Sequence, residues 1–264
     1  MHIESTWRIL TIGDGDLSFS HALKQKYPQL NLVATVLDTE TALRAKYQYN
    51  AIDLLKALNV KVLFEFDATQ PHCWDNLSQH FDVVIFQFPL IPSFTSKAEF
   101  EQSQYPINTL NRILLRKFIH YSQTKALDLN GPMLSYITSK DVKPYREWNI
   151  EGSLVTGLPY HYLGQSPFHI GSFPGYLIRN VDRDKHVKDT KGFTYVWSSK
   201  PSTTVQLELN FPHYLNEHYC TFCRAGRFLN EMDKTKHERA KSHKLMHKYE
   251  QIWQSYLDNE SLEM

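Results

Sequence analysis

Short apolar runs alternate with stretches of helical periodicity through the first part of the chain. The runs are rich in Val, Ile and Leu, and the apolar residues between them recur near helical spacing. Strands that are apolar on both faces indicate an α/β fold, with a mainly parallel sheet and helices on both faces. The predicted strands are 7–12, 31–37, 61–66, 82–88 and 132–138. The predicted helices are 17–27, 40–58 and 107–128.

The pattern changes beyond this predicted sheet. The connection from about 165 to 192 is rich in Gly, Pro and aromatic residues, which is typical of a functional loop. We expect residues 1–212 to form one domain and residues 213–264 to form a small appended unit. Three later apolar segments predict antiparallel strands added to the sheet, at 160–164, 193–199 and 203–209.

The stretch TIGDGDLSFS places a glycine-rich turn between the first predicted strand and the first predicted helix. Gly13 and Gly15 permit a tight backbone and let a ligand approach without a Cβ in the way. In an open α/β sheet, ligands bind beyond the carboxyl ends of the strands. Asp38 and Asp67 end the next two predicted strands, so acidic side chains from three strand ends meet at this edge.

The turn suits some ligands better than others. A dinucleotide site needs a further glycine where this chain has Ser18, and the Asp14 and Asp16 carboxylates would repel a pyrophosphate. S-adenosylmethionine carries an ammonium, a sulfonium and a ribose but no phosphate, so the acidic edge matches it electrostatically. The alternative is a plain tight turn in which Asp16 or Ser18 caps the following helix.

Several segments, taken in order, carry a family resemblance. ILTIGDGDLSFSHAL, NLVATVLDTE, FDAT and FDVVIFQFP resemble the Rossmann-like methyltransferases typified by eukaryotic large-subunit rRNA uridine-N-3-methyltransferases. NRILLRKF, SKDVKPYREWNI and FPGYLIR resemble later blocks of that family, so the resemblance covers roughly residues 7–200. It implies a class I methyltransferase Rossmann-like fold and methyl transfer from S-adenosylmethionine to a base nitrogen of RNA.

The resemblance also implies roles for individual residues. Asp38 would bind the ribose of the cofactor, and Asp67 and Thr69 would lie near its adenine. The cofactor loop would consist of Gly13, Asp14, Gly15, Asp16, Ser18 and Phe19. The catalytic residues, beside the methyl group and the target base, would be Gln87, Phe88 and Pro89, with Gln87 also counted in the cofactor site.

The fourth predicted strand departs from the family at its end. The family's Asn-Phe-Pro-His reads here Gln-Phe-Pro-Leu, so the amide is kept and the histidine is replaced by Leu90. The Gln87 amide can hold a base edge, and Phe88 can stack on the base, although a buried strand ending in a turn has the same pattern. Deprotonation of a ring nitrogen calls for a general base, for which the candidates are His120, His161 and His169.

Two later segments, 143–149 and 173–179, mix basic and aromatic side chains. Such a mixture suits a flipped or single-stranded base with its phosphates. Surface loops packed by aromatic residues have the same composition. The predicted RNA-binding residues are Lys143, Tyr145, Arg146, Trp148, Tyr176 and Arg179.

The C-terminal segment has the spacing of a zinc site. Cys220 and Cys223 are followed by His237 and then by His243, with five residues between the two histidines, within a helix predicted over 229–247. This two-Cys, two-His pattern resembles RNA-associated or matrin-type zinc fingers, and zinc would supply the folding energy that so small a unit lacks. The alternative is a solvated histidine-rich helix beside a chance cysteine pair.

The net charge of +1 conceals an uneven distribution. Residues 220–248 hold eight Lys or Arg against three Asp or Glu, a net of +5 that leaves −4 for the rest. A basic segment on an acidic body favours a polyanionic partner, here RNA and ribosomal RNA in particular. Three cysteines are a poor disulfide framework and favour a reducing compartment. Without a secretory signal or ~18 consecutive apolar residues, we expect no membrane association and a cytoplasmic location, nucleolar in a eukaryote.

The sequence therefore predicts an S-adenosylmethionine-dependent methyltransferase that acts on RNA, at a ring nitrogen of uridine in rRNA. A C-terminal zinc finger would help to hold the RNA. One alternative is a methyltransferase for another acceptor, such as tRNA, a protein or a small molecule. The other, suggested by the lost histidine, is a catalytically degenerate fold that only binds RNA. The oligomeric state is left open.

Overall fold

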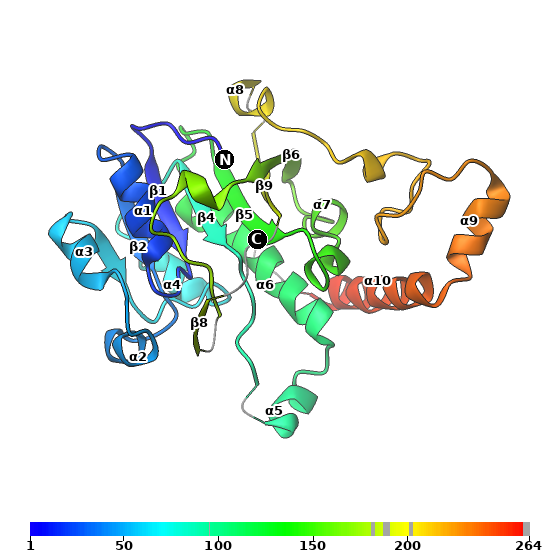
Figure 1. Cartoon of the computed structure of the whole chain (residues 1–264), viewed down its shortest axis with the longest axis horizontal. Helices are drawn as coiled ribbons and strands as arrows, with labels where there is room; N and C mark the ends of the chain where they lie inside the picture. Colours follow the sequence, from blue (N-terminus) through cyan, green and yellow to red (C-terminus); the bar gives the residue numbers. More distant parts are fainter. Residues whose placement is uncertain (95, 181–182, 187–190, 201–202, 261–264) are drawn as a thin grey trace.

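The fold is built on a single seven-stranded sheet. The computed structural model describes residues 1–94, 96–180, 183–186, 191–200 and 203–260. In this part of the chain the strand order is β3-β2-β1-β4-β5-β9-β6 (Figure 1). The strands are β1 (Arg8–Ile12), β2 (Asn31–Thr35), β3 (Lys61–Leu63), β4 (Val83–Gln87), β5 (Leu134–Lys140), β6 (His161–Phe168) and β9 (Gly192–Ser198).

The first five strands in this order are parallel, and β9 runs antiparallel to both β5 and β6. This is the class I methyltransferase arrangement that the sequence predicts, including two of the three predicted antiparallel additions. A short ribbon, β7 (Arg179–Asn180) with β8 (Arg183–His186), lies outside the sheet within the 165–192 connection.

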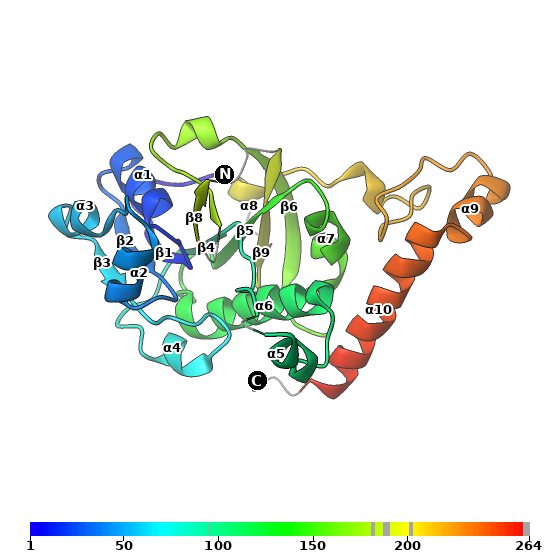
Figure 2. The same cartoon turned by 60° about the horizontal axis from the view of Figure 1, so that its bottom comes forward.

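Helices cover both faces of the sheet, because successive strand residues alternate between two apolar cores. Ile9 of β1 faces the core that holds α1 and α3, whereas Leu10 faces the core of α4 and α6. Figure 2 shows these two groups on opposite sides of the strands. The helices are α1 (Ser18–Lys26), α2 (Glu40–Lys46), α3 (Ile52–Ala57), α4 (Pro71–Asp75), α5 (Lys97–Gln102), α6 (Ile107–Tyr121) and α7 (Ile150–Ser153).

The helix predicted over 40–58 is wrong as a single element, because the chain breaks between α2 and α3. Tyr47 ends α2 and is only 1% exposed. Its hydroxyl lies 3.2 Å from the Cβ that a side chain on Gly15 would carry, and Ala51 N–H donates to the carbonyl of Asp16 at 2.9 Å. The break thus packs the α2–α3 connection against the glycine turn.

The strand predicted at 203–209 is also wrong. Residues 203–206 form a short helix, α8 (Thr203–Gln206). Only Asn210 continues the sheet, through reciprocal backbone hydrogen bonds of 2.9 Å with Gln165 of β6. Val205 is instead buried in the core, so its apolar character reflects helix packing rather than strand pairing.

The helix predicted over 229–247 is two helices, α9 (Glu231–Glu238) and α10 (Lys241–Asn259). The Asn230 side chain caps α9 by accepting from Asp233 N–H at 2.9 Å. The turn between the helices brings His237 and His243 together, with 3.1 Å between Nε2 and Nδ1. Figures 1 and 2 show α9 at the tip of an arm and α10 running back to α6.

The C-terminal half of α10, for which the sequence suggests no role, anchors this arm to the sheet domain. Glu250 pairs with Arg112 of α6 at 2.8 Å, and the Arg112 guanidinium carbon lies 4.4 Å from the Trp253 ring centre. Arg116 of α6 binds Glu260 just beyond the helix end at 2.6 Å. Among the described residues, no helix combines the length and apolar character needed to cross a bilayer.

Candidate active site and metal cluster

A cavity of about 450 Å³ opens at the carboxyl ends of β1, β2, β4 and β5. Its walls come from the glycine turn, the ends of these strands and the 176–179 segment. Of the predicted cofactor-binding and catalytic residues, three are not among its lining residues: Ser18, Phe19 and Pro89. The structure brings the others together here: Gly13, Asp14, Gly15, Asp16, Asp38, Asp67, Thr69, Gln87 and Phe88.

Glycine is required at the first position of the turn. Gly13 has a φ of +60°, and a Cβ there would lie 2.8 Å from the ring of Phe86 on β4. A side chain would therefore strain the backbone and push Phe86 out of place. The bare backbone leaves this part of the cavity open to a ligand.

Asp14 and Asp16 serve the helix that follows the turn. The Asp14 carboxylate accepts from Ser20 N–H at 2.6 Å, and Asp16 accepts from Ser18 N–H at 3.0 Å. Burial, together with the charge of Asp16, raises the pKa of Asp14 to about 7. The turn is thus a helix cap, as the simpler alternative proposes, and it also lines the cavity.

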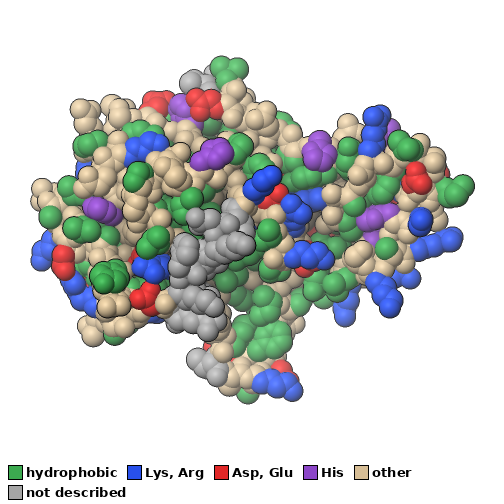
Figure 3. All heavy atoms as spheres, in the orientation of Figure 1, with side chains coloured by type: hydrophobic (Ala, Val, Ile, Leu, Met, Phe, Trp, Pro, Cys, Tyr) green, Lys and Arg blue, Asp and Glu red, His purple; other side chains and the backbone are tan. Residues whose placement is uncertain are grey.

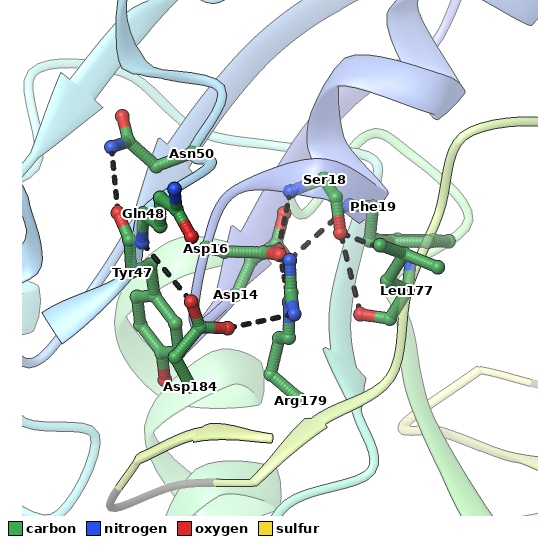
Figure 4. Close-up of polar contacts among 10 residues, drawn as sticks. All are labelled: Asp14, Asp16, Ser18, Phe19, Tyr47, Gln48, Asn50, Leu177, Arg179 and Asp184. Atoms are coloured by element: carbon green, nitrogen blue, oxygen red, sulfur yellow. Dashed lines mark hydrogen bonds and ion pairs between the residues drawn. The ribbon is translucent and has the colours of Figure 1, made fainter. Parts of the chain in front are cut away.

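A distant segment of the chain lies over this turn (Figure 4). The Arg179 guanidinium donates to Asp16 at 2.5 Å and to Asp184 at 2.8 Å. Ser18 and Leu177 exchange hydrogen bonds of 3.2 and 3.4 Å between the hydroxyl and the backbone. Arg179, predicted from the sequence to contact RNA, therefore balances an acid of the turn.

The acids at the ends of β2 and β3 are also engaged. The Asp38 carboxylate accepts from Lys46 Nζ at 2.6 and 2.8 Å. One oxygen of Asp67 accepts from both the backbone N–H and the hydroxyl of Thr69, each at 2.8 Å. The edge is consequently less negative than the sequence suggests, and a ribose on Asp38 would share the carboxylate with Lys46.

Gln87 is the unsatisfied group of the cavity. It ends β4 and is 7% exposed, and both atoms of its amide are buried with no hydrogen-bond partner among the described residues. Leaving a buried polar group unpaired costs ~1–3 kcal/mol. Because Gln87 lines the cavity, a ligand with both a donor and an acceptor would remove that cost.

Phe88, which follows Gln87 in the chain, and Lys140 line the same cavity. Phe88 has a φ of +46° and donates its N–H to the Thr138 carbonyl of β5 at 2.8 Å. This conformation is rare for a bulky residue and costs ~1–3 kcal/mol. Lys140 ends β5, is 5% exposed, and places its ammonium 5.9 Å from the Phe88 ring centre. Sequence analysis missed Lys140, for which the only signal is a lysine closing an apolar strand.

The predicted RNA-binding residues fall into separate places. Tyr145, Tyr176 and Arg179 line the cavity. Trp148 is 1% exposed and packs against Tyr145, so it is part of the core rather than a surface contact. The exposed pair, Lys143 and Arg146, forms ion pairs with Glu147 and Asp141.

None of the candidate histidines lies at the cavity, nor does any other histidine of the described chain. His120 is buried and hydrogen-bonded to the Tyr160 hydroxyl at 3.2 Å. His161 and His169 are exposed on and beside β6. The described residues therefore place no imidazole where it could act as a general base.

Cys220, Cys223, His237 and His243 form a second cluster, whose possible ligand atoms all lie within 4.8 Å of one another. The His243 Nδ1 atom is 3.5 and 3.7 Å from the two sulfurs. A hydrogen bond from Cys223 lowers the pKa of Cys220, which favours the thiolate. Two sulfur and two nitrogen donors at this spacing fit a tetrahedral zinc ion.

The chain is similar to proteins of a known family. The family model described as rRNA (uridine-N3-)-methyltransferase BTM5-like matches residues 10–180. An uncharacterized protein of Arabidopsis thaliana is 31% identical over 183 residues, covering 67% of this chain and 84% of that protein. Heavy metal-associated isoprenylated plant protein 41 of the same plant is 30% identical over 185 residues, covering 69% of this chain but 34% of that protein.

Among solved structures, precorrin-6y C5,15-methyltransferase from Geobacter metallireducens aligns over 74% of this chain and 81% of its own, with 12% identity and a TM-score of 0.42. The family match includes the glycine turn and the end of β4, and it stops before the cysteine and histidine cluster. The chain therefore belongs to the BMT5-like family of rRNA (uridine-N3-)-methyltransferases and is an S-adenosylmethionine-dependent methyltransferase.

Proposed function

We propose that the protein methylates a ring nitrogen of uridine in ribosomal RNA. The observation that carries this proposal is the unsatisfied Gln87 amide in the cavity wall. A uracil edge offers carbonyl acceptors next to an N–H donor, which an amide can match with its own donor and acceptor. Family membership supports the same acceptor.

The cofactor end of the cavity fits S-adenosylmethionine. Gly13 and Gly15 line the cavity without side chains, Asp38 offers carboxylate oxygens for ribose hydroxyls, and Asp67 lies beyond β3. When bound, the cofactor would supply a methyl group on positively charged sulfur. The base nitrogen would take the methyl group, and the sulfur would keep the electrons of the broken carbon–sulfur bond.

The acceptor end has an amide, an aromatic ring and a cation. Gln87 would orient the base edge, and Phe88 would stack on the base. The Lys140 ammonium would stabilise the negative charge that develops on a uracil carbonyl oxygen as the ring nitrogen loses its proton to water. A preorganised cation of this kind lowers the need for the histidine that this chain lacks.

Methylation assays decide among the three possible activities. The protein is incubated with labelled S-adenosylmethionine and either rRNA, tRNA or a protein extract, and digested nucleosides are identified by mass spectrometry. Methylated uridine from rRNA is the expected result. Label only in tRNA or protein would assign another acceptor, and cofactor binding or RNA binding without any transfer would assign a degenerate fold.

Asp38→Ala should weaken S-adenosylmethionine binding by about 10- to 100-fold, or about 1.4–2.8 kcal/mol. The reason is the loss of charge-assisted hydrogen bonds to the ribose. Calorimetric titration measures the effect. Asp53→Ala is the matched control, because Asp53 is paired with Arg44 at 2.8 Å but lies outside the cavity. Equal affinities in the two variants would remove the ribose assignment.

We also propose one zinc ion at the C-terminal cluster. Cys220→Ser should leave the purified protein without stoichiometric zinc, because one of four ligands is lost and metal binding supplies folding energy to this unit. Metal analysis after dialysis makes the measurement. Cys73→Ser, which changes a cysteine outside the cluster, should retain one zinc. A wild-type protein purified without chelator and free of zinc would contradict the assignment.

The arm that carries this cluster is proposed to hold RNA by its phosphates. Figure 3 shows Lys and Arg side chains gathered along it. Charges of one sign on one surface favour backbone contacts over a base code. We propose that residues 213–264 act as an appended RNA-binding unit on the 1–212 domain. Its exposed cations on α9, α10 and the intervening turn are Lys234, Lys236, Arg239, Lys241, Lys244 and Lys248.

A further inference from the structure

Arg224 links the metal cluster to the sheet domain. It directly follows Cys223 in a tight turn, where its φ is +50° and its N–H donates to the Thr221 carbonyl at 3.3 Å. Cys220 and Ala225 close the same turn by reciprocal backbone hydrogen bonds of 2.7 and 3.3 Å. The direction of the Arg224 side chain is therefore set by the turn that holds the two cysteines.

The Arg224 side chain leaves the arm and is buried against the sheet domain, where it is 7% exposed. One guanidinium nitrogen lies 2.8 Å from a Glu151 oxygen, and another lies 3.3 Å from Asp141. The guanidinium carbon stands 4.9 Å from the ring centre of Tyr214, whose hydroxyl donates to Glu151. Because the Glu151 side chain is 1% exposed, its charge depends on these partners.

Asp141 connects this contact to the acceptor end of the cavity. It follows Lys140 at the end of β5 and begins the 141–149 segment, whose Tyr145 lines the cavity. Its carboxylate also accepts from Arg146 within the segment at 2.7 and 2.8 Å. The Asp141 carboxylate is thus shared between Arg224 of the turn that holds the cysteines and Arg146 of the 141–149 segment.

We propose that Arg224 is a positioning residue that couples metal binding at the cysteine and histidine cluster to the conformation of the 141–149 segment. With the metal bound, the turn holds Arg224 on Asp141 and Glu151, and these hold the segment that shapes the acceptor end. Coupling between two sites is reciprocal, so a change that disturbs the 141–149 segment must also lower the affinity of the cluster for the metal. The effect on RNA rests on the proposed methylation of RNA, and the linkage between metal and segment rests only on the proposed zinc site.

Arg224→Met tests the coupling against Arg227→Met, which removes the same charge from an exposed position three residues along. In Arg224→Met, hydrogen exchange of 141–149 should rise at least tenfold, and zinc affinity in a chelator competition should fall about tenfold, the size typical of an outer partner of a metal site. The KM for RNA should rise with a smaller change in kcat, while S-adenosylmethionine affinity stays within about twofold. Arg227→Met should show neither the exchange nor the zinc effect.

The proposal is overturned if Arg224→Met folds and its hydrogen exchange in 141–149 and its zinc affinity both equal those of Arg227→Met. Should Arg224→Met not fold, Asp141→Asn serves instead: weakened zinc binding supports the coupling, and wild-type zinc affinity overturns it. Chelation of the wild-type protein gives an independent measure, because exchange in 141–149 must rise as zinc leaves. If the linkage holds and wild-type protein methylates no RNA, the proposed function fails alone.

Discussion

Replacing Lys140 with methionine is expected to lower kcat for RNA methylation by about 10²–10³-fold, the size found when one preorganised charge-stabilising donor is removed from an active site. Lys140 is 5% exposed, lines the cavity, and places its ammonium 5.9 Å from the ring centre of Phe88, which follows Gln87 in the chain. Burial strengthens its interaction with charge on the base, because less water screens it. Binding of S-adenosylmethionine should stay within about twofold, since Lys140 lies at the other end of the cavity.

The pH profile separates this role from simple damage to packing. Without the cation, the ring nitrogen loses its proton less readily, so the activity of Lys140→Met should recover towards high pH and narrow the difference from wild type. A loss of the same size at every pH would contradict the electrostatic role. Lys125→Met is a suitable control, since Lys125 pairs with Asp75 at 2.6 Å and lies outside the cavity.

Replacing Glu250 with alanine should lower the free energy of unfolding by about 3–5 kcal/mol, because it leaves a buried charge on Arg112 without its partner. The Arg112 side chain is 0% exposed and is bound by Glu250 at 2.8 and 3.0 Å. Burial lowers the pKa of Arg112, and the Glu250 carboxylate opposes that effect. Thermal or denaturant unfolding measures the change, and the melting temperature should fall by roughly 10 °C.

Two further variants test this assignment. Glu40→Ala breaks a solvent-exposed ion pair with Arg44 and should lower the free energy of unfolding far less than Glu250→Ala does. Combining Glu250→Ala with Arg112→Met removes both buried charges and should restore part of the loss. Equal destabilisation by Glu250→Ala and Glu40→Ala would mean that α10 does not pack on α6 in solution.

The strands of the parallel sheet were predictable because the residues that mark a strand lie within the strand and its flanking turns. An apolar run bounded by a turn, such as the one before Gly13 or the one ending at Gln87, needs only its neighbours to be recognised. The two broken helices were not predictable in this way. The break after Tyr47 depends on packing against the glycine turn, and the break before Lys241 brings two histidines together. Both breaks depend on contacts between residues of different elements, and the spacing of apolar residues within one element does not reveal such contacts.

The candidate sites also have features that the sequence predicts and features that it does not. From the sequence, the glycine turn and the acids at strand ends predict the sheet edge at which the cavity opens, and the spacing of Cys220, Cys223, His237 and His243 predicts that these four residues meet. The sequence does not show how the charges at that sheet edge are paired. Asp16 and Asp38, which suggest an open negative surface, are paired with Arg179 and Lys46. Lys140, which lines the same cavity, belongs to no sequence motif that would have pointed to it.

The sequence by itself determined the strands of the parallel sheet and the fold class that their alternation with helices implies. It also indicated two candidate sites, the glycine turn with its neighbouring acids and the group of two cysteines and two histidines. These depend on residue spacing over a few positions, which backbone geometry converts directly into a shared edge or face. Only the tertiary structure decided which charges meet. Arg179 reaches Asp16 across 163 residues and Arg112 reaches Glu250 across 138, because burial brings together groups that must then neutralise one another.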